Sequence, residues 1–140
     1  MGRVARLCRA RGLVLLIGGD GRAALAYGAG LHVPDRANCR NLLIFLMNRR
    51  GRLLSVALHG RGGVARARRL RADAALVSPA FPTASHPGAP GLGPHRWGAL
   101  ARVAGRPAVA LGGMDARRLR RLPRRWAAGW AAIGAWQGAR

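Results

Sequence analysis

Lysine and glutamate are both absent from this chain of 140 residues. Arginine therefore supplies all 25 basic side chains, four aspartates supply the acids, and the net charge is +21. A basic chain can indicate nucleic-acid binding, because arginines neutralise phosphates and release counterions. The arginines are spread along the whole chain, however, and an excess of Ala, Gly, Arg and Pro without lysine is typical of a GC-rich genome. A dedicated nucleic-acid site is therefore the less favoured interpretation.

Cysteine is scarce, and long apolar runs are missing. Cys8 and Cys39 show no CxxC pairing and no Cys/His ligand spacing, so reduced thiols are expected. No run approaches the roughly 18 apolar residues of a membrane span. The N-terminus has no apolar core followed by a cleavage site, so a secretory signal is not expected. These absences favour a cytoplasmic protein without a membrane partner.

The length allows one domain over residues 1–140. Short apolar runs alternate with Ala/Arg-rich stretches that suit helices, and glycine or proline separates them. Six repeats of strand and helix with short connections predict an α/β fold with a parallel sheet, although the pattern does not distinguish an open sheet from a barrel. The predicted strands are 13–17, 30–33, 53–58, 74–77, 107–111 and 131–133. The predicted helices are 22–27, 36–48, 63–71, 96–104 and one after Asp115 that Pro123 kinks or shortens.

Glycines and polar residues gather where these predicted strands end. In both parallel architectures, ligands bind at the carboxyl ends of the strands. Glycine at such a turn lets backbone N–H groups approach a phosphate, and the dipole of the following helix favours the anion. Gly112-Gly113 has this place, and the long loop 78–94 adds the hydroxyls of Thr83 and Ser85 and a possible cation in His86. The pattern predicts an anion site, although the loop can also be read as a plain surface loop.

Two segments, 73–83 (DAALVSPAFPT) and 108–114 (AVALGGM), are similar in order and spacing to the thiamine-phosphate synthase/TenI family. The segment 28–33 resembles an earlier strand of that family, and the likeness can be followed from about 13 to 136. It implies a TIM-type β/α barrel that is incomplete, with six of eight βα units and no counterpart of the first two strands. We expect a misplaced start or a truncated gene, and two exposed sheet edges that a second copy of the chain could cover.

The resemblance also implies which residues hold a thiazole phosphate. Thr83 and Ser85 match the two hydroxyl positions of the family's loop, and His86 replaces its lysine and is partly charged at pH 7. Gly112 and Gly113 match its phosphate-binding glycines. The final backbone contact to the phosphate falls on Ile133-Gly134.

The metal side of the family's site does not match. The synthase joins a pyrimidine methyl pyrophosphate to a thiazole phosphate with the help of Mg²⁺, which prefers carboxylate ligands. Its ligand positions fall on Gly18-Gly19 and near Ala37, while Asp20 and Asp35 lie close by but are offset. The resemblance therefore implies no metal ligand that can be named here.

The TenI branch of the family isomerises a thiazole phosphate carboxylate and uses a histidine after the fifth barrel strand to transfer a proton. His59 matches that position, and histidine suits acid–base chemistry near neutral pH. The other interpretation is that His59 only hydrogen-bonds a neighbouring loop. We therefore expect an enzyme of thiamine biosynthesis, either a synthase-like transferase or a TenI-like tautomerase. A catalytically inactive, phosphate-binding relative is the alternative, and an arginine-rich nucleic-acid binder is less favoured.

Overall fold

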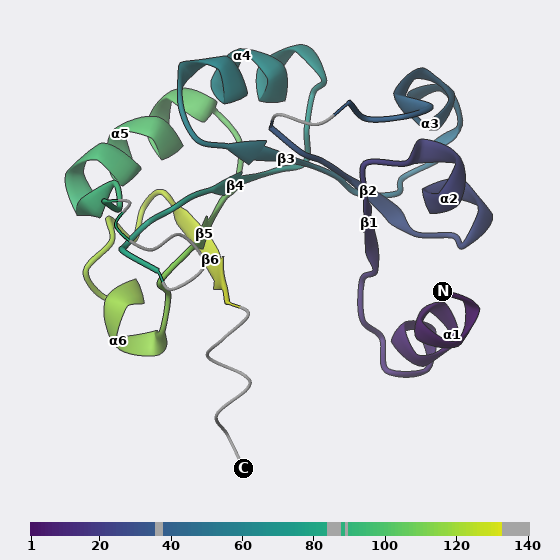
Figure 1. Ribbon diagram of the computed structural model, residues 1–140, viewed down its shortest axis with the longest axis horizontal. Coiled ribbons are helices and arrows are strands. Elements are labelled where there is room, and N and C mark those ends of the chain that lie inside the picture. The colour runs from purple at the N-terminus through teal and green to yellow at the C-terminus, as the bar shows by residue number, and fades with distance from the viewer. Residues whose placement is uncertain (36–37, 84–87, 89, 133–140) are drawn as a thin grey trace. The chain divides into compact units, whose positions relative to one another are not determined.

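The computed structural model describes residues 1–35, 38–83, 88 and 90–132. Within these ranges six helices alternate with six strands (Figure 1). The strands follow chain order in a parallel sheet whose two ends are the first and the last strand, so the sheet does not close. The predicted α/β class is confirmed, and the unclosed sheet agrees with the predicted incomplete barrel. The elements are α1 (Gly2–Ala10), β1 (Leu16–Gly18), α2 (Gly21–Ala26), β2 (Gly30–Val33), α3 (Leu42–Asn48), β3 (Leu54–Leu58), α4 (Arg61–Arg69), β4 (Ala74–Val77), α5 (Gly93–Ala104), β5 (Ala108–Leu111), α6 (Ala116–Leu119) and β6 (Ala127–Ala131).

The chain forms two compact units, Met1–Val56 and Ala57–Arg140. In the first unit, β2 pairs in parallel with β1 and with the start of β3. Helices α2 and α3 lie side by side next to these strands (Figure 1). Leu31, Phe45 and Leu54 are fully buried, because they lie on the apolar faces of β2, α3 and β3, which form the core of this unit.

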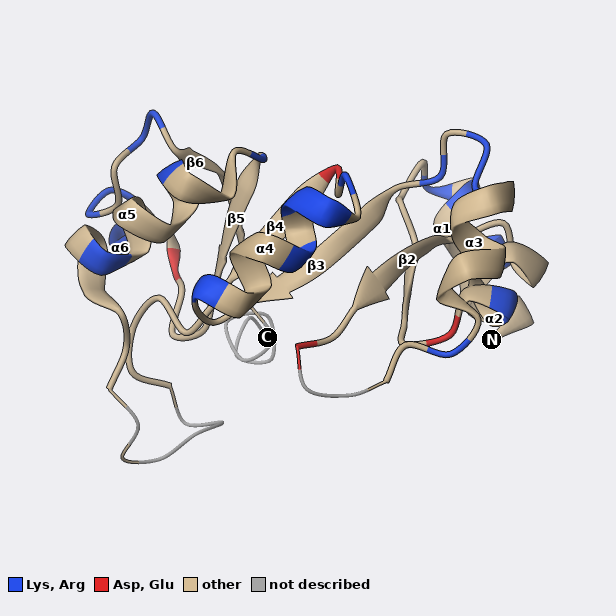
Figure 2. Cartoon of the chain, turned by 90° about the horizontal axis from the view of Figure 1, so that it is seen from above, with Lys and Arg blue, Asp and Glu red and all other residues tan. Residues whose placement is uncertain are grey.

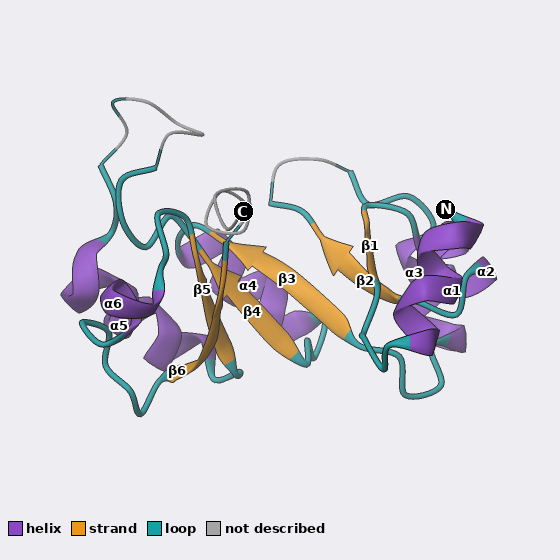
Figure 3. Ribbon diagram, turned by 90° about the horizontal axis from the view of Figure 1, so that it is seen from below, coloured by secondary structure: helices purple, strands orange, loops and turns teal. Residues whose placement is uncertain are grey.

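In the second unit, β4, β5 and β6 run side by side in the same direction (Figure 3). Helices α4 and α5 pack on each other, and α5 covers β4. The core centres on Trp97, which is fully buried and donates from its indole Nε1 to the carbonyl of Val77 over 3.2 Å. Alternate residues of β4 and β5 face this core, which leaves Ser78 and Leu111 on the opposite face at the strand ends.

Several predicted boundaries are wrong, each for a local reason. Helix α1 is missing from the prediction, and its apolar side chains Val4 and Leu7 remain exposed. Residues 38–41 are not helical, so α3 begins only at Leu42. The helix after Asp115 is short, as predicted, and ends at Leu119, before the proline at 123. Strand β6 begins at Ala127 rather than at 131, because its pairing with β5 starts there.

In the described part of the chain, the segments coloured for arginine lie on helices and on connecting loops in both units (Figure 2). Among the described residues, no helix combines the length and the apolar character that crossing a bilayer requires.

Candidate functional site

His59 and Ser78 meet where β3 and β4 end in the second unit. The imidazole Nε2 of His59 lies 2.9 Å from the hydroxyl Oγ of Ser78. The backbone of Ser78 is itself fixed, because its N–H donates to the carbonyl of Leu58 over 3.1 Å. Ser78 is buried and the His59 ring is exposed. The contact joins His59 to the first residue of the loop after β4. It is compatible with a purely structural role of His59 and also with a histidine held in place for proton transfer.

The loop after β4 packs on the turn after β5. Ala80 donates its N–H to the carbonyl of Leu111 over 2.8 Å, and Phe81 donates to Gly112 over 3.1 Å. Gly112 and Gly113 have φ values of +86° and +60°, a left-handed backbone that favours glycine. A Cβ on Gly112 would lie 2.9 Å from the Cα of the proline at 79, and one on Gly113 would meet the carbonyl of the proline at 82. Both glycines are therefore required by packing as well as by conformation.

The same contacts decide where the amides of this turn point. The carbonyl of Gly112 accepts from Phe81, and the carbonyl of Gly113 accepts from the Arg118 guanidinium. In a planar trans peptide the N–H points opposite to the carbonyl. The N–H groups of Gly113 and Met114 therefore point away from Phe81 and Arg118, respectively. Two amides in succession, held rigidly at a strand end, are suitable donors to an anion.

The guanidinium of Arg118 contacts both the carbonyl of Gly113 and the ring of Phe81. Besides Gly113, its guanidinium lies over the Phe81 ring, 5.6 Å from the centroid, and the Arg121 guanidinium lies 5.3 Å from the same centroid. The sequence analysis did not predict this role for Arg118. Helix α6 is only four residues long, so it presents no periodic face from which the role could be read.

Asp115 begins α6 and occupies the N-terminus of that helix. Its carboxylate accepts the backbone N–H of Arg118 over 2.7 Å. This hydrogen bond, together with that from Arg117 and the charges of the two guanidiniums, lowers the pKa of Asp115 below the ordinary aspartate value. A charged carboxylate at this helix end opposes a second anion there, so an anion is better placed at the Gly112-Gly113 turn.

The structure brings several of the predicted site residues to one end of the second unit. His59 lies against Ser78, Thr83 is partly buried beside the proline that touches Gly113, and Gly112 and Gly113 form the turn below the loop. The remaining predicted residues lie outside the described ranges; they are Ser85, His86, Ile133 and Gly134.

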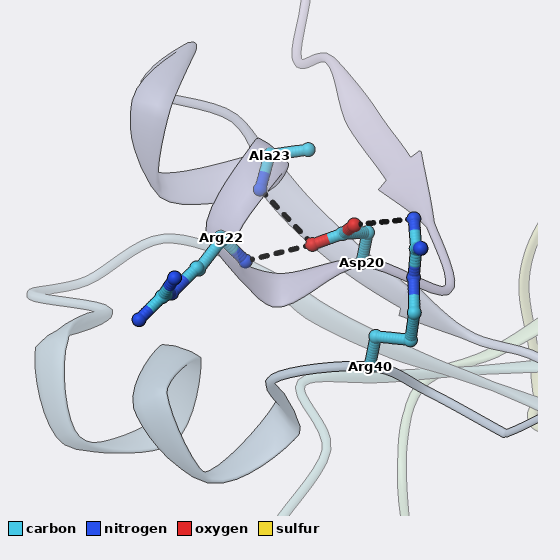
Figure 4. Close-up of polar contacts among 4 residues, drawn as sticks. All are labelled: Asp20, Arg22, Ala23 and Arg40. Carbon is cyan, nitrogen blue, oxygen red and sulfur yellow. Dashed lines mark hydrogen bonds and ion pairs between the residues drawn. The ribbon is translucent and has the colours of Figure 1, made fainter.

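The carboxylate of Asp20, in the first unit, is fully engaged (Figure 4). Its Oδ1 caps α2 by accepting the N–H groups of Arg22 and Ala23, and its Oδ2 pairs with Arg40 at 2.8 Å. The hydrogen bond from Ala23 is the main cause of a lowered pKa for Asp20, and the charge of Arg40 adds to it. Asp20 is therefore a helix cap and not an available metal ligand.

The described residues do not fit the Mg²⁺ site that the fold family implies. They contain no group of three His, Cys, Asp or Glu side chains that could hold a metal ion. Glycine stands at 18 and 19, where the resemblance places metal-ligand positions, and Ala37 lies outside the described ranges.

A second histidine–serine contact lies within the first unit. The Nδ1 of His32 is 2.9 Å from the Oγ of Ser55, and Ser55 is almost fully buried in β3. Both serines were missed by the sequence analysis, because a lone serine in a strand carries no motif. The signal that could have found them is a polar residue at a position facing away from the helices.

The family model described as thiamine monophosphate synthase matches residues 1–136 of the chain. The chain belongs to this family. Its fold is also similar to that of a solved structure, a thiamine phosphate pyrophosphorylase from Pyrococcus furiosus, with a TM-score of 0.72 and 18% sequence identity. The match covers 92% of this chain and 61% of that protein, so this chain spans less than two thirds of its relative. No match to a curated protein is found.

The family assignment confirms the resemblance carried by 73–83 and 108–114. At 18% identity, the solved structure supports the fold, and the six parallel strands match part of its barrel. The family match extends to residue 1 and so includes α1, whereas the resemblance described from the sequence motifs began only at about residue 13.

Proposed function

We propose that this family member is an enzyme of thiamine biosynthesis that binds a thiazole phosphate at the carboxyl ends of β4 and β5. The family match supports the pathway. The observation that carries the binding site is the packing of the loop at 79–82 on Gly112 and Gly113, which fixes two successive amides at a strand end. Thr83, next to this loop, offers a hydroxyl to the same ligand.

The phosphate is held by neutral donors in this proposal. Amide N–H groups of Gly113 and Met114 donate to its oxygens, as backbone amides do in other phosphate sites. Arg118 and Arg121 hold positive charge around the Phe81 ring and raise the electrostatic potential of the region for an anion.

The reaction that these residues favour is proton transfer. Joining a pyrophosphate substrate to a thiazole with Mg²⁺ needs ligands gathered around the ion, and the described residues contain no group of three His, Cys, Asp or Glu side chains that could hold it. His59 stands at the end of β3 with one ring nitrogen on a serine hydroxyl. Its neutral imidazole can accept a proton from one atom of the bound thiazole, and the imidazolium can return it to another, which leaves an isomer with no net gain or loss. A TenI-like tautomerase is thus the favoured form of the proposal, ahead of the synthase.

Separate assays of binding and turnover test this function. We expect the purified chain to bind thiazole phosphate in isothermal titration and to isomerise the thiazole phosphate carboxylate in an NMR assay. Thr83→Ala should weaken binding, whereas His59→Ala should retain binding and lose turnover. His95→Ala is the matched control, because His95 is exposed on α5. Binding without turnover in the wild type would instead identify a phosphate-binding protein without activity, and no binding by a folded sample would refute the proposal.

Such an enzyme is expected in the cytoplasm. Cys8 and Cys39 are free thiols in the structure, as is common for proteins of a reducing compartment.

A further inference from the structure

We infer that Ser78 is a positioning residue that holds the His59 ring in one orientation in both of its protonation states. The inference deepens the proposed function and rests on it for its catalytic consequence. Its physical basis is the 2.9 Å contact between the His59 Nε2 and the Ser78 Oγ, which joins the end of β3 to the end of β4.

Ser78 is well suited to hold another side chain, because its own backbone is fixed on both sides. Its N–H donates to Leu58, and the carbonyl of the next residue, Pro79, accepts from Leu92 over 2.9 Å. Pro79 in turn packs against Gly112. The side chain of Ser78 is therefore attached to a fixed backbone, and the residue is buried. An exposed imidazole has two side-chain torsions to restrain, and a fixed partner at one ring nitrogen restrains both.

The chemistry of a hydroxyl explains why serine suits this place. A serine hydroxyl is both a donor and an acceptor, and its hydrogen can rotate. It accepts from a protonated Nε2 and donates to an unprotonated one, so the same contact persists before and after a proton moves. A carboxylate in this place would accept only and would favour the charged ring. Ser78 therefore keeps the ring in position without selecting one charge state.

The contact between His32 and Ser55 provides a matched control. It is also a histidine–serine pair with a 2.9 Å contact, but it uses Nδ1 and lies within the first unit. Ser55→Ala removes a hydroxyl of the same kind from a histidine that is not placed in the proposed catalytic site. Effects common to both variants report general loss of a buried hydroxyl, and effects confined to Ser78→Ala report the positioning of His59.

The direct test measures the imidazole nitrogens of His59 by ¹⁵N NMR over a range of pH in the wild type, Ser78→Ala, Ser78→Thr and Ser55→Ala. We expect Ser78→Ala to change the ¹⁵N shift of the His59 Nε2 at both ends of the pH range, whereas Ser55→Ala changes the shifts of His32 alone. Ser78→Thr, which keeps the hydroxyl, should restore the wild-type signals. An unchanged His59 spectrum in folded Ser78→Ala would overturn the inference.

The kinetic test separates positioning from a structural contact. Loss of one hydrogen bond that orients a reacting group should lower kcat of the tautomerase about 2- to 10-fold in Ser78→Ala, with KM unchanged. Partial recovery is expected in Ser78→Thr. A changed His59 spectrum with unchanged kcat would show that the contact is structural, and positioning would be refuted. If the wild type has no turnover, the proposed function fails, and the NMR series alone decides whether Ser78 holds the ring.

Discussion

The amide N–H of Phe81 donates to the carbonyl of Gly112 over 3.1 Å, and this bond joins the loop after β4 to the turn after β5. The contact organises the candidate site, because it fixes the peptide planes whose N–H groups can bind an anion. It also means that the turn is rigid before any ligand arrives. Preformed donors lose little conformational entropy on binding.

Gly112→Ala should destabilise the protein and weaken binding of thiazole phosphate together. A left-handed backbone costs an alanine about 1–2 kcal/mol, and the clash with Pro79 adds a further roughly 1–3 kcal/mol. Gly105→Ala is the control, because Gly105 has φ +62° with open space around its Cβ position. Chemical denaturation should show the larger loss for Gly112→Ala. Equal losses in the two variants would contradict the packing described here.

Trp97→Phe tests the indole hydrogen bond at the centre of the second unit. The substitution leaves the carbonyl of Val77 without its donor inside the core, which should cost about 1–3 kcal/mol of unfolding free energy. Trp126→Phe is the control, since Trp126 is only partly buried. We expect a clearly smaller effect for Trp126→Phe in urea unfolding. A reversed order would show that the core is centred elsewhere.

Asp20→Ala and Asp20→Asn separate the cap of α2 from the charge pair with Arg40. Asparagine can still accept the N–H groups of the first turn, so its variant should lose less thermal stability at pH 7 than the alanine variant. The folded pKa of Asp20 is lowered, so its charge stabilises the protein above the unfolded value of about 3.9, and this contribution is lost as the pH falls further. The unfolding temperatures of wild type and Asp20→Asn should therefore converge as the pH falls below the lowered folded pKa of Asp20. A constant difference would exclude the charge as its source.

Arg118→Ala should weaken binding of thiazole phosphate by several fold. The variant loses the donor that fixes the Gly113 carbonyl and one of the two charges over Phe81. Arg120→Ala changes the charge equally but removes an exposed side chain, so it controls for net charge. Isothermal titration of both variants measures the difference. Equal weakening would indicate a general electrostatic effect and no specific role for Arg118.

Local sequence patterns predicted the elements that bury continuous apolar runs. Strands 30–33 and 74–77 are found with the predicted bounds, because their side chains are enclosed and glycine, proline or aspartate ends the pattern. The exposed start of the predicted strand at 13–17 is not in β1, since Leu13 and Val14 face solvent and make no sheet contact. Exposure is a tertiary property that an apolar run does not reveal.

The candidate site was predictable in part. The glycine turn and the histidine were found because glycine and histidine are chemically distinctive at strand ends. The roles of Ser78, Arg118 and Asp20 depend on contacts between residues 5 to 20 positions apart, and no local pattern encodes them. The same reason explains why β6 was misplaced, since its position follows from pairing with β5.

Isothermal titration of thiazole phosphate into the wild type and Gly112→Ala decides whether the turn after β5 and the loop packed on it bind a phosphate ester. We expect saturable binding at one site in the wild type and substantially weaker binding in a folded Gly112→Ala sample. Absence of binding to the folded wild type, or equal affinity in both proteins, would contradict this expectation.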